Sequence, residues 1–229
     1  MLVAGADRDD VPQLAVLEGT LDNPERTERI AALSTELLRA RGYAKARVQI
    51  ARRAGCGVEL LVAVDRGPRF RIAQIAFDAN DEFPAEARLA ALEDALGTVN
   101  TVGGAYVEDR LRRALDALAH RYQELGWLDA EIDRPEVSFD DERGEVSLTI
   151  PVRAGRRFRI GNVVARGGKR ATRAAVIQAL GLRGGQWYDA ARVRAGVVRA
   201  RREIDERLEV RVDLAGDRID LEAVVGDAR

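Results

Sequence analysis

Cysteine and histidine are almost absent from this sequence of 229 residues. Cys56 is the only cysteine and His120 the only histidine. A single cysteine excludes an intramolecular disulfide and a cysteine metal cluster. One histidine, with no serine in a nucleophile-elbow context, gives no basis for a histidine-based triad. We therefore expect a protein that is not an enzyme, with no catalytic residue, no metal and no cofactor.

Long apolar runs and a strong net charge are also lacking. No stretch approaches the roughly 18–20 apolar residues of a membrane-spanning helix, and residues 1–4 are too short for a signal peptide. Lys and Arg number 37 and Asp and Glu 38, so the net charge is −1. No overall field therefore attracts the chain to nucleic acid. With 46% hydrophobic and 33% charged residues, the composition is ordinary for a soluble globular protein.

What the sequence does contain is a six-residue motif that occurs twice, 88 positions apart. Gly67-Pro68-Arg69-Phe70-Arg71-Ile72 returns as Gly155-Arg156-Arg157-Phe158-Arg159-Ile160. Apolar residues alternate with arginine, as on a half-buried strand, and the preceding glycine permits a sharp turn. We interpret both copies as joints and predict three modules, residues 1–66, 67–154 and 155–229.

The apolar spacing predicts the order strand, helix, helix, strand, strand in the second and third modules. In the second module we expect strands at 69–77, 130–139 and 145–152, with helices at 84–96 and 111–125. In the third we expect a strand at 158–165, helices from Thr172 and at 189–204, and a hairpin that turns at 215–217.

The first module follows the same order in part. We expect helices at 11–18 and, capped by Asn23 and Pro24, up to Gly42, then a hairpin of strands 46–51 and 58–64. Counting back 88 positions from Gly67 leads to a point before residue 1. We therefore expect this module to lack its first strand.

The fold class that follows is α+β, in tandem β-α-α-β-β modules. The helical stripes are one-sided and the strands mostly alternate, so each module should place two helices on one face of a three-stranded mixed sheet. The two strands of each hairpin are antiparallel, and the first strand joins them across the helical crossover. Such a sheet has two edges, which offer unpaired N–H and C=O groups.

An exposed edge strand can accept an extended peptide, with main-chain hydrogen bonds and little sequence specificity. We predict that the strand after the second helix of each module does so. The alternative is that charged side chains, among them Arg52, merely guard these edges. The candidate residues are Arg47, Val48, Gln49, Ile50, Glu131, Ile132, Asp133, Val210, Arg211 and Val212.

Two further patterns offer alternatives. Gly181-Leu182-Arg183-Gly184 joins two helices and matches the GXXG loop with which KH domains clamp RNA. The loop between the helices of the second module is longer, so the motif does not repeat, and the net charge of −1 is not the strongly basic charge that such RNA binding usually requires. The helix at 192–207 is rich in arginine, which indicates a solvated face or a patch for anionic lipid.

The modules resemble POTRA domains. The resemblance rests on both joint motifs, on Leu125–Ile132 and Arg41–Val48 after the long helices, and on the Gly-Gly-X-Tyr step at 103–106 with its counterpart at 184–188. It covers the chain from about Asn23 onward. It implies an Omp85-type outer-membrane assembly or translocation protein, similar to BamA or TamA, with these modules on the periplasmic side of the bacterial outer membrane.

The resemblance also implies what the chain binds. We expect unfolded outer-membrane or secreted polypeptides and periplasmic partner proteins, possible contact with a membrane surface, and no nucleic acid. The family's own C-terminal β-barrel is expected to lie beyond this chain. The receptor arm of a two-partner secretion transporter is a related alternative, and a KH-like RNA-binding module is an alternative of a different class.

Overall fold

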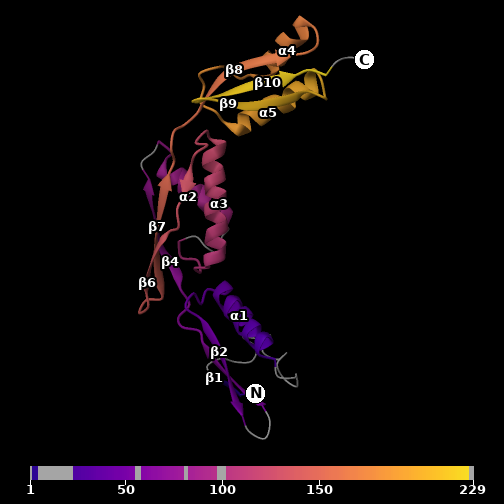
Figure 1. The fold of residues 1–229 in the computed structure, drawn as a ribbon. Helices are drawn as coiled ribbons and strands as arrows, with labels where there is room; N and C mark the ends of the chain where they lie inside the picture. The colour runs from indigo at the N-terminus through magenta and orange to yellow at the C-terminus, as the bar shows by residue number, and fades with distance from the viewer. Residues whose placement is uncertain (1, 5–22, 55–57, 80–81, 97–101, 227–229) are drawn as a thin grey trace. The chain divides into compact units, whose positions relative to one another are not determined.

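The computed structural model describes residues 2–4, 23–54, 58–79, 82–96 and 102–226 (Figure 1). Within these residues the chain forms three sheets with accompanying helices, and the predicted α+β class is confirmed. The elements are β1 Leu2–Ala4, α1 Pro24–Ala40, β2 Arg47–Ala54, β3 Val58–Asp65, β4 Arg71–Ala79, α2 Ala85–Leu96, α3 Glu108–Glu124, β5 Glu131–Ile132, β6 Glu136–Asp140, β7 Glu145–Arg153, β8 Arg159–Arg166, α4 Arg170–Leu180, α5 Ala190–Glu203, β9 Glu209–Ala215 and β10 Arg218–Val224.

The first module has a sheet of order β1-β3-β2, in which β1 runs parallel to β3 and β2 antiparallel to it. The expectation that this module lacks its first strand is therefore wrong. Val3 pairs with Val62, 59 positions later, much as Ala165 pairs with Ala223 in the third module, 58 positions later. The offset of 88 positions is the length of the second module, which is longer than the first. Counting back by this offset therefore placed the first strand before residue 1.

Helix α1 begins where the sequence predicted. The side-chain Oδ1 of Asn23 accepts a hydrogen bond from the backbone N–H of Arg26 at 3.1 Å, and Pro24 occupies the first turn. Both features stabilise a helix N-terminus. Ile30 and Leu38 of this helix are buried in one core with residues of the hairpin. The predicted helix at 11–18 lies outside the described residues. The turn between the two hairpin strands was predicted at 53–57: Arg53 and Ala54 instead belong to β2, and residues 55–57, with Cys56, lie outside the described residues.

The second module contains a four-stranded sheet. The path is β4-β7-β5, and β6 also pairs with β7. The predicted continuous strand at 130–139 is thus wrong: it is divided into β5 and β6. Pro135 lies in the interruption, and proline cannot donate to a sheet ladder. Helix α3 buries Leu111, Leu118 and Tyr122, as its apolar stripe predicted.

The third module has the sheet order β8-β10-β9, with β8 parallel and β9 antiparallel to β10. Residues of α4 and α5, among them Val176 and Val193, share one core with Ile219 and Leu221 of β10. Both helices therefore pack on the same face of this sheet. Helix α4 begins at Arg170 rather than at Thr172, without a side-chain cap, and Asp189 caps α5.

The chain divides into two compact units. The first comprises Met1–Asp78, Phe83–Ala117 and Arg134–Pro151, and the second Ala79–Glu82, Leu118–Asp133 and Val152–Arg229. Each joint motif lies inside one unit together with the segments that contact it. In the described part of the chain no helix combines the length and the apolar character that crossing a membrane requires.

Candidate functional site

Strand β2, the first predicted edge, lies at one end of its sheet. Its inward side chains Val48 and Ile50 pack against the core of the first module, while Arg47 and Gln49 are exposed. The backbone N–H of Val48 donates to Thr35 Oγ1 of α1 at 3.2 Å. Helix α1 thus covers the apolar face of this edge and uses one of its donors.

Strand β5, the second predicted edge, is only two residues long and carries charge. Arg153 Nη2 lies 2.8 Å from Glu131 Oε2 and 2.8 Å from Asp133 Oδ1. The side chains of Arg153 and Glu131 are largely exposed, and that of Asp133 is partly exposed. Ile132 is half-buried. Short strands and charged side chains are the usual protection of a sheet edge. On the neighbouring β6, Phe139 packs edge-on against Phe70, with ring centroids 4.8 Å apart.

Strand β9, the third predicted edge, differs from the other two. Within the described residues it pairs with β10 alone. Val212 is 50% exposed and Leu214 62% exposed. Arg211 is exposed as well, whereas Val210 is half-buried against the core. Leu214 was not among the predicted site residues, although its alternation with Val210 and Val212 was visible in the sequence.

The register of the hairpin shows on which face these side chains lie. Val212 pairs with Leu221 and Leu214 with Ile219, and paired residues of antiparallel strands share a face. Leu221 and Ile219 are both 1% exposed, beneath the helices. Val212 and Leu214 therefore lie on the same face of the sheet as the helices. They are at the edge of that face, beyond the area that the helices cover. Covering both would contribute on the order of 2 kcal/mol.

The joints are built from backbone hydrogen bonds as well as side chains. In the first unit, the N–H of Phe70 donates to the carbonyl of Gly42 at 3.1 Å. The N–H of Ile72 donates to Gly104 at 2.9 Å, and that of Tyr106 to Phe70 at 2.9 Å. The loop between the two helices thus pairs with the joint strand, which in turn is anchored to the glycine after α1.

The second unit repeats this pattern. Phe158 N–H donates to Gly126 at 2.7 Å, Ile160 N–H to Gln186 at 2.7 Å, and Tyr188 N–H to Phe158 at 3.1 Å. Phe158 and Ile160 are each 1% exposed. The repeated sequence motif therefore forms a repeated hydrogen-bonded structure.

The side chains at the two joints differ in chemistry. In the second, the Arg157 guanidinium lies 4.3 Å from the centroid of the Trp127 ring and 5.0 Å from that of Trp187. Its Nε donates to the carbonyl of Leu125 at 3.0 Å, and desolvation by burial lowers the pKa of Arg157 below its ordinary value. Arg159 stacks on the other tryptophan, Trp187, at 3.6 Å. Cation–π contacts hold this joint.

The first joint relies on an ion pair. Lys45 Nζ lies 2.5 Å from Asp141 Oδ1 and 2.6 Å from Oδ2. The same ammonium group is 5.4 Å from the Phe70 ring and 5.0 Å from the Phe139 ring. Lys45 and Asp141 are 41% and 62% exposed, and a pair so exposed contributes at most about 1 kcal/mol.

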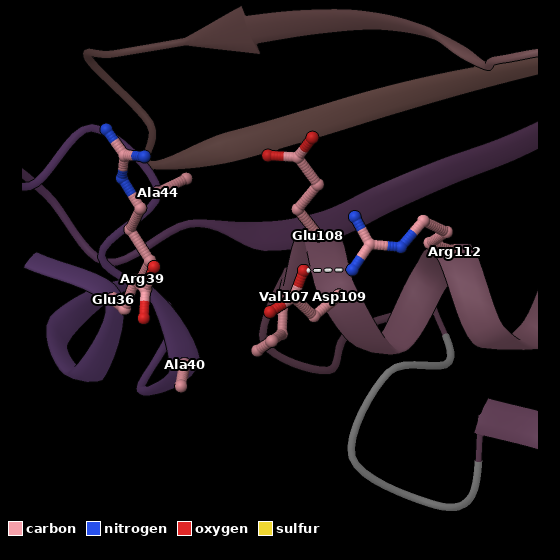
Figure 2. A pocket seen from close by; sticks show the side chains of 8 residues that line it. All are labelled: Glu36, Arg39, Ala40, Ala44, Val107, Glu108, Asp109 and Arg112. Atoms are coloured by element: carbon pink, nitrogen blue, oxygen red, sulfur yellow. Dashed lines mark hydrogen bonds and ion pairs between the residues drawn. The ribbon is translucent and has the colours of Figure 1, made fainter. Parts of the chain in front are cut away.

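A pocket of about 230 Å³ lies in the first unit (Figure 2). Its charged lining residues are Glu36, Arg39, Glu108, Asp109 and Arg112. Arg112 Nη2 is 2.8 Å from Asp109 Oδ1, so the residues partly neutralise one another. The pocket is smaller and more polar than typical sites for small molecules, and we assign no ligand to it.

Of the residues considered for catalysis, Cys56 lies outside the described residues. His120 is exposed on α3. Across the described residues, no group of three or more His, Cys, Asp or Glu side chains is arranged to hold a metal ion.

The GXXG sequence has a structural role. Gly181 ends α4 in the left-handed conformation, with φ of 66°, and a Cβ on Gly184 would lie 2.6 Å from the carbonyl of Gly161. Leu182 is buried in the core. The N–H of Arg183 donates to Gln186 Oε1 at 3.3 Å. Helix termination and close packing therefore account for the glycines without RNA.

The sequence model of the POTRA family, described as surface antigen variable number repeat, matches residues 70–155. No curated protein sequence matches the chain. The resemblance to POTRA domains is confirmed for the matched residues, which form a POTRA domain.

Matches to solved structures extend over almost the whole chain. POTRA domains 3–5 of BamA from Haemophilus influenzae have 18% identity and a TM-score of 0.46, with 99% of this chain and 94% of that chain covered. The N-terminal domain of Omp85 from Thermosynechococcus elongatus has 15% identity and a TM-score of 0.43, with 100% and 95% covered.

Proposed function

We propose that the POTRA domain of residues 70–155 is one of three such modules and that the chain is the periplasmic arm of an Omp85-type outer-membrane protein. In this proposal the arm binds partner proteins and unfolded β-barrel clients without catalysing a reaction. Strand β9 is the edge that accepts an extended client segment. The observation that carries the proposal is the exposure of Val212 and Leu214 on an unpaired edge.

Two features of β9 fit an extended polypeptide. Its free edge offers main-chain donors and acceptors to any sequence in a β conformation, which suits clients that share no motif. Its uncovered apolar side chains offer a place for the apolar residues that alternate along an outer-membrane strand. On β2 the equivalent apolar side chains are covered by α1. On β5 charged side chains protect the edge.

The test is a titration of the isotopically labelled chain with a peptide from an unfolded outer-membrane strand, followed by amide NMR. We expect chemical-shift changes along Glu209–Ala215. The double variant Val212→Glu/Leu214→Glu should weaken binding at least tenfold, because two charges replace the apolar margin. The matched control is Gln49→Glu/Ala51→Glu, which adds the same charge to exposed positions of β2 and should leave the affinity unchanged.

The outcomes separate the alternatives. Loss of binding in the control rather than in the β9 variant would move the client to β2 and overturn the assignment. Binding of a secreted polypeptide in place of the strand peptide would favour the receptor arm of a two-partner secretion transporter. Chemical-shift changes at residues 181–184 on addition of single-stranded RNA would favour the KH-like alternative. In that case Arg183→Glu should abolish RNA binding.

A further inference from the structure

The outward face of α5 carries an unusual combination of cations and exposed apolar side chains. Ala191, Ala195 and Val198 follow one line along the helix, since they are spaced by four and three residues. All three are exposed, and Val198 is 65% exposed. The line ends at Arg202, and Arg192 and Arg199 lie beside it, one turn and three turns from the N-terminus, respectively.

The arginines of α5 fall into two groups. Arg194, Arg201 and Arg202 have partners in the protein. Arg194 Nη2 lies 2.8 Å from Glu124 Oε1, Arg201 Nε donates to the carbonyl of Leu208 at 2.8 Å, and Arg202 Nη2 lies 3.3 Å from Glu203 Oε1 at the exposed end of the helix. By contrast, the exposed side chains of Arg192 and Arg199 have no ion-pair or hydrogen-bond partner among the described residues. Their charge is therefore available to a ligand.

No acidic residue interrupts this face. The sequence contains no Asp or Glu between Asp189 and Glu203. Residues 155–229 hold 17 Lys and Arg against 10 Asp and Glu, whereas residues 67–154 hold 10 against 18. The net charge of −1 thus conceals a strongly basic third module, and the attraction of α5 for anions is not cancelled by its neighbours in the sequence.

We propose that this face of α5, defined by Arg192, Ala195, Val198, Arg199 and Arg202, binds the anionic phospholipid headgroups of a membrane surface. The shape of the surface distinguishes this ligand from an acidic protein. The cations are at the ends of long side chains, and small apolar side chains lie between them. Interfacial helices combine the same features, with apolar side chains at the headgroup boundary and arginines around them.

The experiment is co-sedimentation of the full 229-residue chain with vesicles of 70% phosphatidylcholine and 30% phosphatidylglycerol, compared with pure phosphatidylcholine. Each cation near an anionic surface changes binding roughly fivefold, so Arg192→Gln/Arg199→Gln/Arg202→Gln should lower the partition coefficient on the order of 100-fold. The matched control, Arg26→Gln/Arg29→Gln/Arg110→Gln, removes the same charge from exposed positions elsewhere and should lose less than threefold.

A fluorescence measurement locates the contact. In a Cys56→Ser background, a bimane label on Val198→Cys should shift to shorter wavelength when the anionic vesicles are added. The same label on Val164→Cys, also at an exposed apolar residue of the third module, should not shift.

Several results would overturn the proposal. These are equal binding to neutral vesicles, an equal loss in both triple variants, or a shift at the Val164 position alone. Binding to polyglutamate with no binding to vesicles would instead assign the surface to an acidic protein.

Discussion

At the scale of single residues, the joints depend on glycines that could not be another amino acid without strain. Gly126 has φ of 100°, and its carbonyl accepts from Phe158. A Cβ at this position would lie 3.0 Å from the carbonyl oxygen of Tyr188 and 3.2 Å from that of Phe158. Gly103 has a similar φ of 90°, but a Cβ there would meet nothing within 4 Å. A side chain at Gly103 would therefore cause backbone strain alone, whereas a side chain at Gly126 would cause backbone strain and close contacts with two carbonyl oxygens.

We predict that Gly126→Ala lowers the stability of the third module more than Gly103→Ala lowers that of the second. Both changes incur the strain of a left-handed alanine, about 1–2 kcal/mol, and Gly126→Ala adds the close contacts with two backbone oxygens. The measurement is the midpoint of thermal unfolding for each variant. Equal shifts would show that the backbone oxygens move aside without cost.

Tyr106, at the first joint, should make the stability of the folded chain depend on pH. It is 4% exposed, and desolvation by burial, with a smaller contribution from Glu108, raises its pKa from 10.0 to about 12. Because the folded protein holds the proton more tightly than the unfolded chain does, the stabilisation is complete below pH 10 and is lost as the pH rises through 12.

We therefore predict that the stability difference between the wild-type chain and Tyr106→Phe shrinks or reverses between pH 10 and pH 12 in favour of the variant. Urea unfolding at fixed pH values measures it. A difference that stays constant across this range would mean that the Tyr106 hydroxyl ionises as readily in the folded protein as in the unfolded chain.

At the scale of helices and strands, the sequence predicted whatever depends on local periodicity. The alternation around Phe70 and Phe158, the cap at Asn23 and the stripe of α3 all follow from side-chain spacing. The division of the strand at Pro135 was also readable, because proline cannot donate. The position of β1 was missed because one repeat length was applied to modules of different lengths.

The open edge itself could not be found from periodicity. Val210, Val212 and Leu214 have the same alternation, and alternation alone assigns all three to the core. Only the packing of α4 and α5 decides that the first is half-buried and the other two remain exposed. Likewise, the contacts of Arg157 join Trp127 and Trp187, 60 positions apart in the sequence, and no local pattern indicates such a meeting.

At the scale of the whole molecule, the two joints use different forces for the same backbone arrangement. The Lys45–Asp141 pair is exposed, so salt screens it. The Debye length falls from about 10 Å at 0.1 M salt to about 3 Å at 1 M. The stack of Arg157 on two tryptophans depends on close contact with aromatic rings and should be far less sensitive to salt.

Hydrogen exchange of two amides tests this difference. The Phe70 and Phe158 N–H groups each donate across one joint, so their exchange rates report its opening. We predict that Lys45→Met accelerates exchange of Phe70 about fivefold or less at 0.1 M salt and has no effect at 1 M. Arg157→Met should accelerate exchange of Phe158 about tenfold at both concentrations. An effect of Arg157→Met that disappears at 1 M salt would contradict the stacking argument.

The hydrogen bond from the Phe158 N–H to the Gly126 carbonyl also limits where the chain can be divided into fragments that keep their contacts. An excised cassette that starts at the repeated motif, at residue 155, would leave the Phe158 donor and the Arg157 side chain without Gly126 and Trp127. The second compact unit accordingly takes in Leu118–Asp133 along with the third module. A segment that keeps both contacts must therefore begin before Gly126, so the repeat seen in the sequence does not coincide with the segment that holds these contacts together.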